Sequence, residues 1–92
     1  MAVYMAIWSF HNGRNFEDQR SFLERLAIFE HTVDPSITNM AWIATYLTAT
    51  DLDKFLSVAL DKGDALFIAQ IEKGRCQGTL QLATWRWIDE RV

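Results

Sequence analysis

The sequence is poor in the residues that cross-link or interrupt a chain: its 92 residues include one cysteine, Cys76, and one proline, Pro35. A single cysteine excludes an internal disulfide, fits a reducing compartment and has no neighbours at metal-ligand spacing. No apolar run reaches the roughly 20 residues of a membrane span, and the N-terminus lacks the basic start and cleavage site of a secretory signal. We therefore expect a cytoplasmic protein without resident metal, cofactor or membrane partner.

Positive charge is also scarce. Nine Lys and Arg against twelve Asp and Glu give a net charge of -3, and the basic residues form no run. This balance excludes broad attraction to nucleic acid and leaves only a local basic patch as a surface for it. Aromatic residues are abundant, with four Trp, six Phe and two Tyr, although so short a chain offers them little interior. The composition predicts a single domain, residues 1–92, and favours an oligomer.

Three apolar runs rich in β-branched and aromatic residues predict strands, at residues 2–10, 39–47 and 65–72. Residues 29–33 are ambiguous and could hold a short fourth strand before Pro35. Residues 80–91 could alternate as a strand, but their apolar spacing fits a short helix slightly better.

Helix signals stand between these runs. Asn12-Gly13 predicts a turn, after which Asn15 caps a helix that ends near Ile28. Thr48 to Asp51 resembles a capping box that opens a second helix, and Gly63 suits a left-handed stop after it. The apolar stripe of the first helix is predicted to comprise Phe16, Phe22, Leu23, Leu26 and Ala27. The order of elements predicts an α+β domain of ferredoxin-like type, β-α-β-β-α-β with a short terminal helix or strand.

Ser9 and His11 are the first candidates for chemistry. They share one face of a strand that continues to residue 11. A serine beside a histidine could act as a nucleophile with its general base. No Gly-x-Ser-x-Gly elbow surrounds this serine, however. The alternative interpretation is a half-buried serine followed by a turn histidine.

Two further candidates are binding residues. Asn12 and Arg14, with Gly13, could present backbone amides and a guanidinium to phosphate or nucleic acid near a helix N-terminus; the alternative is a turn with a solvated or ion-paired arginine. Trp85 and Trp87 could stack nucleobases on a strand. On a helix they point about 200° apart, so one packs inward and the other meets a partner subunit, which makes them predicted interface residues.

Four segments together cover most of the chain, in order. They are the first strand MAVYMAIWSF followed by GRNF, then WIATYLTATDL, LDKGDALFIAQI and the closing TWRWIDERV. This ordered set resembles the small CRISPR-associated proteins that dimerise at the centre of the spacer-integration complex. It also resembles their stand-alone relatives, the VapD-like toxin nucleases and the SinR-like proteins.

The resemblance implies a ferredoxin-like protomer in a symmetric dimer. Catalytic members of the family are metal-dependent nucleases that use an Asp at the end of strand one, and the matching position here is Ser9. A serine hydroxyl is a poor ligand for a hard divalent cation compared with a carboxylate. The stretch from Trp8 to Phe16 therefore resembles a catalytic corner without its acid.

Two functions follow as expectations. The first is a non-catalytic homodimeric interaction or scaffold module that binds a protein partner or, weakly, nucleic acid. The second is a divergent Mg²⁺- or Mn²⁺-dependent endonuclease acting on RNA or DNA, which uses His11 or a displaced carboxylate such as Asp34 or Asp64. A small-ligand binder is a third class, because fold does not fix function.

Overall fold

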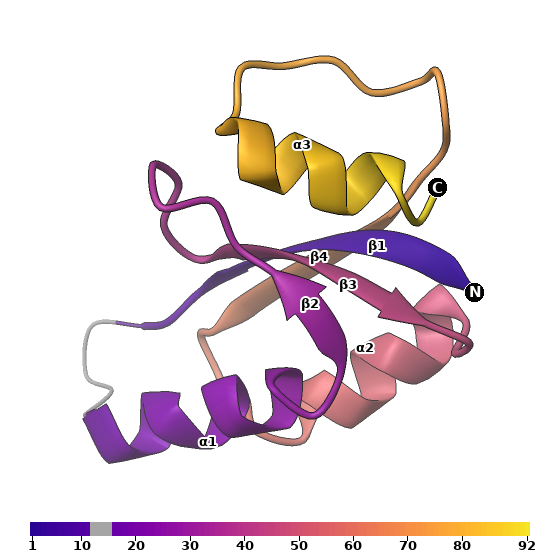
Figure 1. Cartoon of the computed structure of the whole chain (residues 1–92). Coiled ribbons are helices and arrows are strands. Elements are labelled where there is room, and N and C mark those ends of the chain that lie inside the picture. The colour runs from indigo at the N-terminus through magenta and orange to yellow at the C-terminus, as the bar shows by residue number, and fades with distance from the viewer. Residues whose placement is uncertain (12–15) are drawn as a thin grey trace.

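The computed structural model describes residues 1–11 and 16–92, which form a four-stranded antiparallel sheet and three helices in one α+β domain (Figure 1). The predicted strands at 2–10, 39–47 and 65–72 are confirmed, the ambiguous segment holds a short strand, and the tail is a helix. The predicted turn at Asn12-Gly13 and the cap at Asn15 lie outside the described residues. In chain order the elements are β1 (Ala2–Ser9), α1 (Phe16–Leu26), β2 (Glu30–Thr32), β3 (Met40–Thr45), α2 (Ala49–Ser57), β4 (Ala65–Ile71) and α3 (Leu82–Asp89).

The sheet has the order β2-β3-β1-β4, and each neighbouring pair is antiparallel. Along β1, Ala2 lies opposite Thr45 of β3, and Ser9 lies opposite Ala65 of β4. Each of α1 and α2 thus connects two strands that have a third strand between them. The longest edge strand is β4, whereas β2 at the other edge has only three residues.

Side-chain alternation divides β1 between two apolar clusters. Tyr4, Ala6 and Trp8 face α1 and α2 and form the main core with the buried Phe22 and Leu26 of α1. Leu23, which the sequence placed on the buried stripe of this helix, is 42% exposed. That expectation was wrong because the buried stripe runs through Phe22 and Leu26, which lie four residues apart on one face of the helix. Leu23 follows Phe22 and therefore turns toward solvent.

The opposite face of the sheet packs on α3, as Figure 1 shows with α3 above the strands and α1 and α2 below them. Val3, Trp42, Ala44 and Ile88 are the buried members of this second cluster. Because both faces carry apolar side chains, β1 and β3 read as continuous apolar runs and not as alternating ones.

The start of α3 is held by a buried carboxylate, Asp34, which is 1% exposed. One oxygen accepts the backbone N–H of Gln81 at the N-cap of α3 (2.9 Å), and the other accepts the backbone N–H (2.9 Å) and hydroxyl of Ser36. These bonds, the Ser36 hydroxyl first, lower the pKa of Asp34 from 3.8 to about 2 against the opposing effect of burial. The role of Asp34 is therefore to tie the loop before β3 to α3.

The predicted start of α2 is confirmed, whereas the helix ends at Ser57 with Val58 as a right-handed C-cap, before the turn that holds Gly63. Thr48 Oγ1 accepts the backbone N–H of Asp51 at 3.1 Å, which satisfies one of the free donors of the first turn. Gly63 has a φ of 94°, in the left-handed region that favours glycine. The chain can therefore reverse after α2 and enter β4 directly.

Candidate functional site

The end of β1 meets the turn between α2 and β4. The backbone N–H of His11 donates to Asp64 Oδ1 at 2.8 Å, and the backbone N–H of Asp61 donates to Asp64 Oδ2 at 2.8 Å. Asp61 Oδ2 lies 3.7 Å from His11 Nε2. The turn is close-packed there, because a Cβ on Gly63 would lie 3.3 Å from the Cβ of His11. Asp64 thus clamps two strand ends together, and a histidine and two carboxylates come to one corner.

The predicted pair of Ser9 and His11 diverges at this corner. Ser9 is the last residue of β1, exposed and opposite Ala65, whereas His11 contacts Asp61 and Asp64 beyond the end of the strand. The candidate phosphate-binding residues Asn12 and Arg14 lie outside the described residues. The sequence offered Asp64 only as a displaced carboxylate of an endonuclease, and the structure adds Asp61 and the contacts of both residues with His11.

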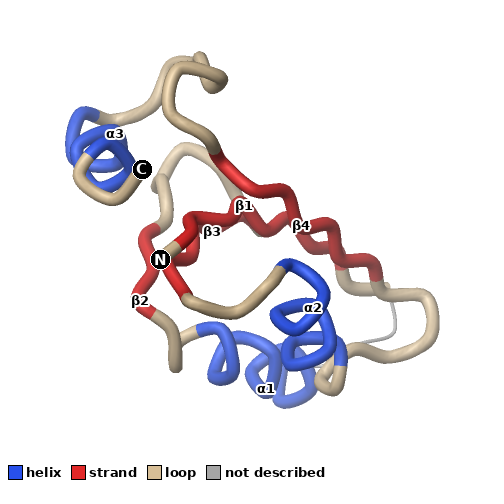
Figure 2. Tube along the Cα trace, turned by 90° about the vertical axis from the view of Figure 1, so that its right-hand side faces the viewer, coloured by secondary structure: helices blue, strands red, loops and turns tan. Residues whose placement is uncertain are grey.

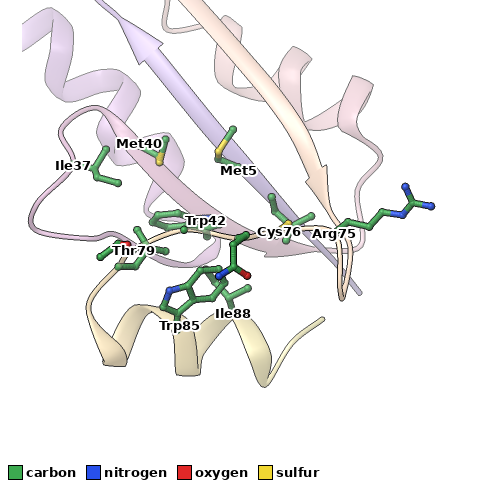
Figure 3. Close-up of a pocket in the computed structure, with 13 residues that line it drawn as sticks. Met5, Ile37, Met40, Trp42, Arg75, Cys76, Thr79, Trp85 and Ile88 are labelled. Atoms are coloured by element: carbon green, nitrogen blue, oxygen red, sulfur yellow. The ribbon is translucent and has the colours of Figure 1, made fainter.

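A cleft of about 430 Å³ lies between α3, the loop at residues 72–81 and the sheet. Figure 3 shows Trp85 and Ile88 reaching from α3 toward Trp42 of the sheet, with Met5 and Met40 beside them. Pockets of this size that bind small molecules combine an apolar lining with a few converging polar groups.

The cleft has few such polar groups. Arg75 stands at its rim and points outward in Figure 3, and its Nε lies 3.2 Å from Glu72 Oε2. The cleft therefore provides apolar contact without a charged group directed into it.

Trp85 and Trp87, predicted as interface residues, both lie on α3 and are half-buried against the second cluster. The guanidinium carbon of Arg91 lies 4.2 Å from the ring centre of Trp87, and Arg91 also pairs with Glu30 of β2. Both indoles thus help dock α3 on the sheet, and their contact with a partner chain stays a prediction.

A second apolar surface lies beyond α3. Ile7 and Phe67 face each other across β1 and β4, and their exposed fractions are 38% and 62%. Ser9 and Ala65, the next pair on the same face of the sheet, are exposed as well. Figure 2 shows why: α3 sits on the β2 and β3 side of the sheet, away from the start of β4. We call these four residues the Phe67 patch; it contains no charged side chain.

The sequence analysis missed the Phe67 patch, although a signal for it was present. In ALFIAQI the period of a strand places Phe67 on the opposite face from Leu66 and Ile68. Phe67 stays uncovered because α3 lies away from the start of β4, a position that no local sequence pattern sets.

Comparisons of the chain with protein-family models, with curated proteins and with solved structures find no match. Within residues 1–11 and 16–92, no group of three or more His, Cys, Asp and Glu side chains is arranged to hold a metal ion. None of the helices in the same residues has the length and apolar content that crossing a membrane requires.

Proposed function

We propose that this domain is a non-catalytic homodimeric interaction module with a ferredoxin-like arrangement. The strand order β2-β3-β1-β4 and the two strand-helix-strand halves support the ferredoxin-like part of the proposal. The resemblance to the small dimeric CRISPR-associated proteins supports the homodimer.

The observation that carries the proposal is the Phe67 patch. An aromatic side chain that is 62% exposed, beside the partly exposed Ile7 and without a charge between them, is costly to leave in water. Contiguous apolar patches on small domains mark sites of protein contact. A second copy in contact with Phe67 would remove the most exposed part of this surface from solvent.

Ser9 links the patch to the absence of catalysis. It occupies the position at which the nucleases of the resembled family carry their acid, and here that position is part of the Phe67 patch. A hydroxyl in an apolar contact surface tolerates burial better than a carboxylate, whose charge costs far more to desolvate. The same substitution therefore weakens metal binding and favours protein contact.

The net charge of -3 favours a protein over nucleic acid as the partner that the patch recognises. A further protein, or weakly bound nucleic acid, would then bind the assembled dimer. The α3 surface around Trp87, which also holds Leu82, Arg86 and Glu90, is available for that second contact, since this side chain is only half-buried.

Sedimentation equilibrium tests the proposal. The wild-type chain should be a dimer at micromolar concentration, and Phe67→Ser should weaken the dimer by roughly tenfold or more, as loss of a central aromatic contact does. Tyr46→Ser is the matched control, because Tyr46 is 84% exposed and follows the far end of β3. A wild-type chain that stays monomeric at micromolar concentration would overturn the proposal.

A metal-dependent endonuclease is the second candidate; its histidine would be His11, which lies 3.7 Å from Asp61 Oδ2, although no group of the described side chains is arranged to hold a metal ion. The test is an assay with Mg²⁺ and Mn²⁺ on single- and double-stranded RNA and DNA, with Ser9→Asp in parallel. An interaction module leaves all four substrates intact in the wild type. Cleavage by the wild type that His11→Ala abolishes would replace the first proposal with this one.

A further inference from the structure

The edge strand β4 has an unpaired side. Its seven residues, Ala65–Ile71, pair with β1 along one side, and no other strand of the described residues pairs with the other side. At roughly 3.3 Å per residue the open side is about 23 Å long. Figure 2 shows β4 along the outer margin of the sheet. A row of backbone N–H and C=O groups is therefore available there to a further strand.

Nothing in the sequence of β4 protects this edge. Natural sheets blunt exposed edges with charged side chains, proline, bulges or very short strands, and ALFIAQI has no charged residue, proline or glycine. The opposite edge is protected in two of these ways. It is the three-residue β2, and it carries Glu30, which pairs with Arg91. The β2 edge is thus protected against pairing with a further strand, whereas the β4 edge is not.

Both faces beside the open edge carry apolar side chains of β4. On one face Phe67 is 62% exposed. On the other face Leu66 and Ile68 line a shallow groove of about 340 Å³ between β4 and α2, whose α2 side consists of Ala49, Thr50 and Asp53. A strand added to β4 would gain apolar contacts above and below in addition to its backbone hydrogen bonds.

The occupant that fits this edge is a second copy of the same strand. We propose that β4 pairs antiparallel with β4 of a second copy, so that the two four-stranded sheets become continuous; this inference rests on the homodimer proposed above. An antiparallel pair of identical strands is self-complementary about a two-fold axis, because each donor of one copy meets an acceptor of the other.

Charge also selects this edge for contact between identical chains. Two copies that each carry a net charge of -3 repel one another. The uncharged β4 edge lets two copies approach without opposing like charges, whereas pairing across β2 would bring the two Glu30 side chains together.

Electron spin-resonance distances between nitroxide labels test the geometry. In a Cys76→Ser background, a single cysteine replaces Ala65 or Gln70, both exposed on β4. Where the two-fold axis crosses β4 between residues 65 and 70, the distance between equivalent labels on the two copies is roughly 6.6 Å for each residue that separates the label from the axis. The two labelled positions are five residues apart, so the distance measured with the label at 65 and the distance measured with the label at 70 should add up to about 33 Å. This sum does not depend on where between the two positions the axis lies.

A charge at the edge gives an independent measurement. Phe67→Lys should raise the dimer dissociation constant by roughly tenfold or more, although it lowers the net negative charge, because it replaces an apolar contact with a charged side chain on the edge that pairs. Tyr46→Lys adds the same charge elsewhere and should leave the constant unchanged. Circular dichroism of each variant confirms that it is folded.

The outcomes separate the two proposals. A dimer whose label distances add up to a much larger value would overturn the β4 pairing and leave the homodimer intact. A monomer in sedimentation would overturn both, and it would leave the β4 edge to a strand of another protein. A dimer with the predicted sum and weakened by Phe67→Lys supports both.

Discussion

Ile88 should carry much of the free energy that docks α3 on the sheet. Its side chain is 2% exposed and packs with Val3, Trp42 and Ala44. Ile88→Ala removes three carbon atoms, and at about 0.8 kcal/mol for each the lost transfer free energy is about 2.4 kcal/mol. The cavity left behind raises the expected destabilisation to about 3 kcal/mol. For a domain of this size that corresponds to a decrease in Tm of roughly 12–24 °C.

Urea unfolding followed by tryptophan fluorescence measures this change, because Trp42 and Trp85 both belong to the affected cluster. Leu82→Ala is the matched control: it shortens an aliphatic side chain of the same helix that is 65% exposed. The control should alter the free energy of unfolding by no more than about 0.5 kcal/mol. A loss below about 1 kcal/mol for Ile88→Ala would show that α3 does not dock through this side chain.

Three further predictions concern single contacts. The pKa of Asp34 is lowered from 3.8 to about 2 on folding, so its contribution to stability is complete above pH 3.8 and is lost as the pH falls toward 2. In thermal unfolding, Asp34→Asn should flatten the pH profile over that interval, and an unchanged slope would contradict the assignment. Gly63→Ala should destabilise by about 1–3 kcal/mol in urea, because φ is 94° and the new Cβ would meet that of His11 at 3.3 Å. Thr48→Ala should cost about 1 kcal/mol in the same assay, and Thr48→Ser should retain most of the cap.

The parts of the fold that depend on neighbouring residues were predictable from the sequence. The apolar runs predicted β1, β3 and β4, the Thr48 cap predicted the start of α2, and Gly63 marked the turn before β4. The buried face of α1 was misplaced at Leu23, because Phe22, Leu23 and Leu26 fit more than one apolar stripe. Which stripe is buried depends on where α2 and the sheet lie, and the helix sequence does not contain that information.

The candidate site depended on contacts between distant segments. His11 and Asp64 are 53 residues apart and meet only because β4 adds next to β1. Asp34 and Gln81 are 47 residues apart, so the residues around Asp34 could not predict the start of α3 as its partner. The exposure of Phe67 likewise follows from the position of α3, which no local pattern sets.

The measurement that tests the central claim most directly is sedimentation equilibrium of the wild-type chain beside Phe67→Lys and Tyr46→Lys. The account predicts a dimer at micromolar concentration for the wild type and for Tyr46→Lys, and a dimer weakened by roughly tenfold or more for Phe67→Lys. A wild-type monomer, or a dimer that Phe67→Lys leaves unchanged, would contradict it.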